Sequence, residues 1–102
     1  MIENLFKMIQ YPSNGILSKV IEKNEKLNIT LFCMAEGTDI SSHTSTKKGF
    51  VYVIEGDGVF TLEGQEIIME AGKYIYMDEN AVHSLKANKN TSFLLVLANN
   101  IS

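Results

Sequence analysis

The stretch "GTDISSHTSTKKGFVYVIEG", residues 37–56, decides the fold class of this chain. It begins at a glycine turn, passes through a polar segment, and enters a run of aromatic and β-branched residues that favours a strand. The polar segment contains His43, one of only two histidines. The other, His83, lies in "MDENAVHSLKA", residues 77–87, which is also strand-like at its end. Both imidazoles of this histidine-poor chain therefore lie beside expected strands.

Outward from this stretch, short strand-like segments alternate with turn residues along almost the whole chain. We expect strands at residues 16–22, 26–36, 49–56, 59–64, 65–70, 72–77, 81–87 and 91–98. "GDG", residues 56–58, predicts a hairpin turn. Pro12 ends a short N-terminal segment with room for one helical turn. Many short strands at regular spacing predict an all-β sandwich or barrel, formed as one domain over residues 1–102.

Composition narrows the classes of function. The net charge is −3, and all nine basic residues are lysines, so neither a nucleic-acid partner nor bidentate binding of phosphate is expected. The longest apolar run, residues 93–98, is too short to cross a bilayer, so no membrane partner is expected. The N-terminus lacks the pattern of a signal peptide, and the single cysteine forms no intrachain disulfide. These features predict a cytoplasmic protein.

The spacing of glycines and histidines carries a resemblance to a known family. Gly37, His43 and Gly56 are separated by five and twelve residues, and Gly72 and His83 by ten. This pattern resembles the two motifs of small single-domain cupins, the cupin type-2 conserved barrel family, over residues 26–98. The resemblance implies a double-stranded β-helix, or jelly-roll barrel. Positive φ angles are expected at Gly37 and Gly72, and at Asn80, which replaces a motif glycine.

The resemblance also implies an interior pocket. Strand parity places His43 on one face with the odd-numbered residues that follow it. We expect the pocket to be lined by His43, Ser45, Val51, Val53 and His83. In metal-binding cupins, three histidines and a glutamate hold one divalent cation. Here Ser45 and Gly49 stand at two of those positions, so only His43 and His83 carry over.

A metal ion at this pocket would need a further ligand. The candidate is Cys33, if the odd-numbered face of its strand looks into the barrel; the simpler interpretation is a small buried hydrophobic residue. The candidate cofactor is one divalent transition metal, namely Zn, Ni, Mn, Fe or Cu.

Two functions from different classes compete. The preferred hypothesis is a barrel that binds a small organic molecule in its interior, because the scaffold is kept while metal ligands are lost. The alternative is a metal-dependent enzyme, of dioxygenase, isomerase or decarboxylase type, that uses His43 and His83. A sensor module is a third possibility. Strands that are apolar on both faces, such as "FVYVI" and "FLLVL", also predict a homodimer, in which residues 16–22 could pair with the partner's sheet.

Overall fold

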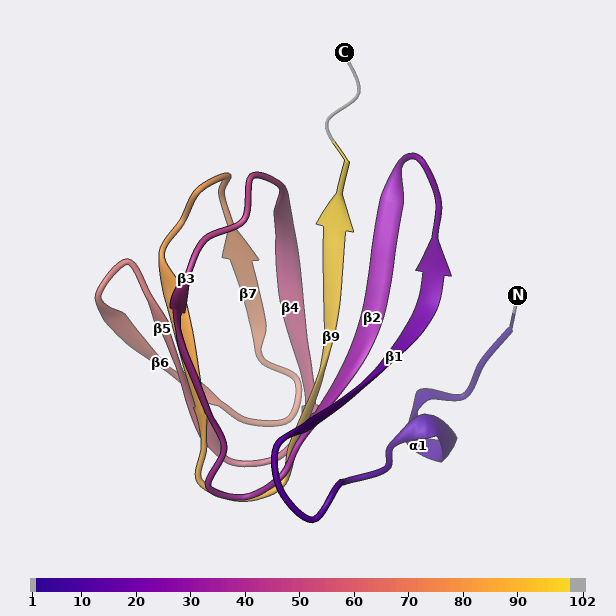
Figure 1. The fold of residues 1–102 in the computed structure, drawn as a ribbon, viewed down its shortest axis with the longest axis vertical. Coiled ribbons are helices and arrows are strands. Elements are labelled where there is room, and N and C mark those ends of the chain that lie inside the picture. The colour runs from indigo at the N-terminus through magenta and orange to yellow at the C-terminus, as the bar shows by residue number, and fades with distance from the viewer. Residues whose placement is uncertain (1, 100–102) are drawn as a thin grey trace.

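A computed structural model describes residues 2–99 and shows a short helix followed by nine strands (Figure 1). Helix α1 (Leu5–Met8) is one turn long, as expected before Pro12, and the Asn4 side chain caps it by accepting a hydrogen bond from the Phe6 amide at 3.1 Å. The strands are β1 (Ile16–Lys23), β2 (Leu27–Met34), β3 (Asp39–His43), β4 (Lys48–Glu55), β5 (Gly58–Leu62), β6 (Gln65–Met69), β7 (Tyr74–Met77), β8 (His83–Ala87) and β9 (Thr91–Ala98).

The strands form two antiparallel sheets. The five-stranded sheet has the order β1-β2-β9-β4-β7, and the four-stranded sheet has the order β3-β8-β5-β6. The two sheets face each other and draw together at one end, which is the lower end in Figure 1. Consecutive strands from β3 to β5 alternate between the sheets, as the jelly-roll topology requires. The predicted fold class, a cupin-like β-barrel with a short N-terminal segment, is confirmed.

Two local features differ from expectation. Residues 39–43 form strand β3, although their polar composition did not indicate a strand. The turn at residues 56–58 is not a hairpin, because β4 and β5 lie in different sheets. Gly56 has φ +133°, and a Cβ there would overlap the Thr91 side chain. The Asp57 amide donates a hydrogen bond to the Thr91 hydroxyl oxygen at 3.1 Å. The contact with Thr91 therefore fixes the path of the backbone where it crosses from β4 in one sheet to β5 in the other.

The left-handed conformations expected from the motif positions are present. Gly37 has φ +85° and Gly72 has φ +88°. Asn80 has φ +63°, which asparagine tolerates better than most residues. Gly37 and Asn80 lie in the turns that precede β3 and β8, the strands that carry the histidines, and Gly72 lies in the turn that precedes β7.

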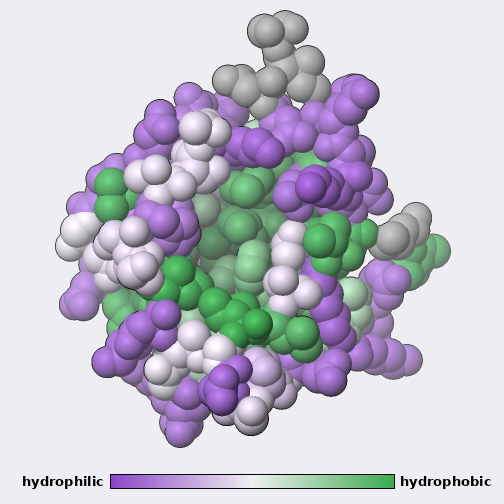
Figure 2. All heavy atoms as spheres, in the orientation of Figure 1, coloured by the Kyte–Doolittle hydropathy of each residue, from purple (hydrophilic) through white to green (hydrophobic). Residues whose placement is uncertain are grey.

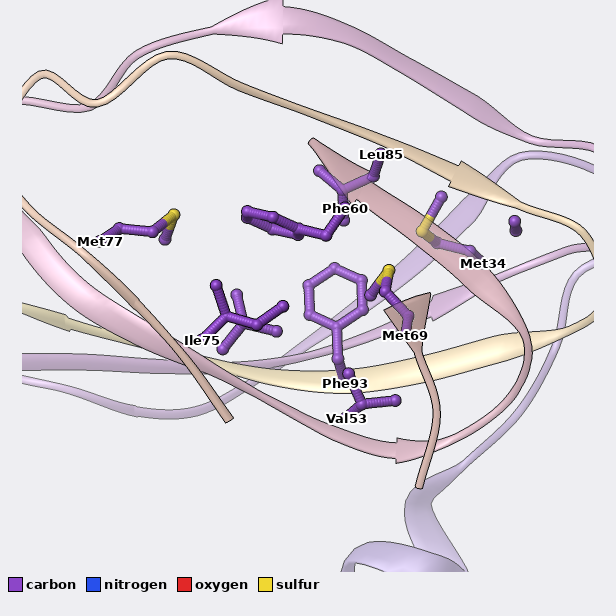
Figure 3. Packing of buried hydrophobic residues seen from close by; sticks show 10 residues of the cluster. Met34, Val53, Phe60, Met69, Ile75, Met77, Leu85 and Phe93 are labelled. Carbon is purple, nitrogen blue, oxygen red and sulfur yellow. The ribbon is translucent and has the colours of Figure 1, made fainter. Parts of the chain in front are cut away.

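The main core fills the space between the two sheets. In Figure 3 the side chains of Phe60 and Leu85, from the four-stranded sheet, face Ile75 and Phe93, from the five-stranded sheet. The Phe93 ring also stacks on Phe32, with ring centroids 5.2 Å apart. The buried members of this cluster are Met34, Val51, Val53, Phe60, Met69, Ile75, Met77, Leu85, Ala87 and Phe93.

A second, smaller core lies on the outer side of the five-stranded sheet. Its buried residues are Leu31, Cys33 and Ile54, and the N-terminal segment packs over them through Leu5, Met8, Ile9 and Tyr11. Strand β2 is therefore buried on both faces, with its even-numbered residues inside the barrel and its odd-numbered residues outside it. Across residues 2–99, no helix is long and apolar enough to cross a membrane.

Candidate functional site

The two histidines lie directly opposite each other on paired strands. His43 ends β3 and His83 begins β8, and the two residues are partners in the antiparallel register. Their imidazole rings are 4.0 Å apart between centroids, at an interplanar angle of 62°. The register shifts between Ile40 and His43, which is a bulge-like irregularity of β3. This irregularity sets the register in which the imidazole of His43 stands beside that of His83.

Each imidazole is oriented by a carbonyl oxygen two residues earlier in the chain. The Nδ1 atom of His43 lies 2.9 Å from the Ser41 oxygen, and the Nδ1 atom of His83 lies 2.9 Å from the Ala81 oxygen. A carbonyl oxygen only accepts hydrogen bonds, so each Nδ1 carries a proton and donates it. In the neutral form of either ring, Nε2 is then the unprotonated atom and presents a lone pair. The pair is thus a set of two hydrogen-bond acceptors.

A cavity of about 220 Å³ adjoins the two rings. Eight of its lining residues are apolar, and the two histidines are its only titratable ones. Figure 2 shows a hollow on this side of the molecule, with a hydrophobic floor and a largely hydrophilic rim. The lining residues are Phe32, Ile40, His43, Val51, Phe60, Met77, His83, Leu85, Phe93 and Leu95.

The environment of His83 keeps its ring neutral. His83 is only 8% exposed, and its ring lies parallel to Phe60 at a centroid distance of 5.7 Å. Burial lowers the pKa of His83 below its ordinary value of 6.5; the hydrogen bond to Ala81 opposes this shift and the neighbouring His43 adds to it. His43 is exposed and stands at the rim of the cavity. The pair therefore combines the imidazole of a largely buried residue with one that solvent can reach.

The structure brings together three of the five residues expected to line the pocket. His43, His83 and Val51 line the cavity, whereas Val53 lies in the packed core and Ser45 in the connection between β3 and β4. There the Ser45 hydroxyl accepts a hydrogen bond from the Lys47 amide at 3.2 Å. The expected position of Ser45 was wrong because β3 and β4 are two strands in different sheets, not one continuous strand.

Several lining residues were not identified from sequence. Phe32 lies on the even-numbered face of β2, opposite the odd-numbered face considered for Cys33, and Ile40 lies in the strand that was not predicted. Four further lining residues lie on expected strands, namely Phe60, Leu85, Phe93 and Leu95. Because apolar residues occur on both faces of such strands, the sequence did not indicate which face is interior. For β2, the large apolar side chains of Phe32 and Met34 were the sequence signal that the even-numbered face is interior.

Cys33 is not a third ligand of the histidine pair. It is fully buried in the outer core, on the opposite face of β2 from Phe32. Among residues 2–99, no group of three or more histidine, cysteine or carboxylate side chains is close enough to hold a metal ion. A tight divalent site requires three or four protein ligands, so the described residues do not fit such a site.

The position of the missing glutamate is closed by backbone. A Cβ atom added to Gly49 would overlap the Val96 carbonyl oxygen, well inside van der Waals contact. A longer side chain at residue 49 therefore requires β4 and β9 to move apart. The loss of this ligand is built into the packing of the two strands.

The fold is a two-sheet antiparallel barrel, and the candidate site is a histidine pair at the mouth of its interior cavity. Residues 30–98 match the family described as Cupin domain, and this chain belongs to that family. No curated protein matches the chain by sequence.

Solved structures share the fold at low sequence identity. A conserved Streptococcus pyogenes protein of unknown function is 22% identical, with a TM-score of 0.88 over 100% of this chain and 90% of its own. A cupin superfamily protein from Desulfitobacterium hafniense is 19% identical, with a TM-score of 0.87 over 94% of this chain and 88% of its own. Salicylate 1,2-dioxygenase from Pseudoaminobacter salicylatoxidans is 16% identical, with a TM-score of 0.76 over 81% of this chain and 26% of its own.

Proposed function

We propose that this protein is a binding barrel for a small organic molecule, held in the interior cavity and anchored by His43 and His83. The observation that carries the proposal is the cavity of about 220 Å³, which combines eight apolar lining residues with two convergent imidazoles. Ligand sites are typically concave and mainly apolar, with a few placed polar groups. An apolar cavity of about 150 Å³ already accommodates benzene. This cavity is thus matched to a six-membered ring with one or two substituents.

The proposal is tested by closing the cavity. Ile40 lines it, so Ile40→Phe places a ring inside, while Ile68→Phe on the exposed side of β6 is a matched control. Small aromatic and aliphatic probes should raise the melting temperature of the wild-type chain and of the Ile68 variant, as mass action requires, but not that of the Ile40 variant. Equal shifts in all three proteins, or none in the wild type, would contradict the proposal.

The alternative, a metal-dependent enzyme, has weaker support. Its favourable observation is that both Nδ1 atoms donate to carbonyl oxygens, an arrangement that also orients metal-ligating histidines. Against it, the described residues supply two ligands, and Gly49 leaves no space for the glutamate. A melting temperature that rises strongly with Zn²⁺, Ni²⁺ or Mn²⁺ at micromolar concentration, and does so only while both histidines are present, would favour the enzyme.

A further inference from the structure

The polar groups of the cavity restrict its ligand to one chemical class. Both Nδ1 protons are used by carbonyl oxygens, so the neutral rings present only acceptors to the cavity. The other eight lining residues offer neither a charge nor a strong hydrogen-bond donor. A ligand that fills the cavity must therefore bring its own donor if the Nε2 atoms are to stay satisfied.

We propose that the cavity selects a neutral, mainly apolar molecule that carries a hydroxyl or N–H donor, such as a phenol, an alcohol or an arylamine. This inference rests on the proposed function and names its ligand class. A carboxylate would meet lone pairs and lose its hydration without gaining a cation, because no lysine lines the cavity. An ammonium group would find acceptors but no carboxylate to balance its charge. A hydrocarbon would cover the Nε2 of His83 and leave it without a hydrogen-bond partner.

Three probes with a shared p-tolyl frame test the class. p-Cresol carries a donor, p-xylene replaces it with a methyl group, and p-toluate replaces it with an anion. Their dissociation constants are measured by calorimetry at pH 7.5, with a chelator present to remove adventitious metal. We expect p-cresol to bind about tenfold tighter than p-xylene, which is the effect of one hydrogen bond. We expect p-toluate to bind most weakly.

Variants assign the preference to the histidines. His43→Leu and His83→Leu each remove one acceptor and keep the cavity apolar. His83 is buried, so its replacement risks the fold; His43 is exposed and its replacement is the safer variant. Loss of the preference for p-cresol over p-xylene, with p-xylene affinity kept, supports the proposal. Tighter binding of p-toluate or p-xylene to the wild type overturns the ligand class but leaves the binding barrel standing, whereas no binding by any probe overturns the proposed function itself.

Discussion

The imidazoles of His43 and His83 meet across the pairing of β3 with β8, with ring centroids 4.0 Å apart. Each ring donates its Nδ1 proton to a carbonyl oxygen of its own strand region. The contact is therefore between two pre-oriented imidazoles, one on a largely buried residue and one on an exposed residue. A pair of this kind, placed beside an apolar cavity, is suited to binding an organic ligand. It supplies only two of the three or four protein ligands that a tight metal site requires.

Replacing the two histidines separates structural from binding roles. His43→Gln should change the free energy of unfolding by less than about 0.5 kcal/mol, because the side chain is exposed. His83→Gln should cost about 1–3 kcal/mol, because a buried carbonyl partner and the stacking on Phe60 are disturbed. Urea unfolding measures both values. A large loss in the His43 variant would show that this residue is mainly structural.

Stability should depend on pH through His83. Its folded pKa lies below 6.5, so near that pH the unfolded chain binds a proton more readily than the folded chain. The contribution to the free energy of unfolding is therefore fully present above pH 6.5 and declines as the pH falls from 6.5 toward the lower folded pKa. Urea unfolding across this range should show the slope in the wild type and a smaller one in His83→Gln. The same slope in both proteins would assign it to other groups.

Cys33 should behave as a core residue with no role at the cavity. It is fully buried between the sheet and the N-terminal segment, so Cys33→Ala should cost about 1–2 kcal/mol of stability. Its thiol should react with a disulfide reagent only after unfolding. The affinity for p-cresol should be unchanged. An altered ligand affinity, or a native thiol that reacts rapidly, would contradict the placement of this residue.

Gly49 should be intolerant of any side chain. A Cβ there would meet the Val96 carbonyl oxygen, so Gly49→Ala should cost about 3 kcal/mol or more. Gly37→Ala is the matched control, because open space surrounds that Cβ and only the φ of +85° opposes it, at a cost of about 1–2 kcal/mol. Thermal melts of the two variants compare these costs. A stable Gly49 variant would reopen this position to a metal ligand.

The fold was accessible from the sequence because its signals are local. Gly37, Gly72 and Asn80 each occupy a left-handed turn conformation that few residues tolerate, and their spacing is visible in the sequence. The histidine pair followed from the same spacing. Most strand positions were also predicted correctly, because strands such as β4 and β9 are rich in apolar residues.

The lining of the cavity was less accessible because it depends on packing. β2 is buried on both faces, so alternation does not reveal that Phe32 faces inward while Cys33 faces the N-terminal segment. β3 is polar and is held as a strand by its pairing with β8, which no local pattern indicates. The turn at Gly56 crosses between sheets because of its contact with Thr91, thirty-five residues away in the chain.

The most direct test of the binding barrel is the map of methyl groups that respond to a ligand. In a methyl-labelled protein titrated with p-cresol, the account predicts saturable NMR shifts of Ile40, Val51, Leu85 and Leu95, which line the cavity. Val96 and Ile29, on the outer side of the sheet, should stay in place. Shifts confined to the outer residues, or no saturable shift at any methyl group, would contradict the claim that the interior cavity is the ligand site.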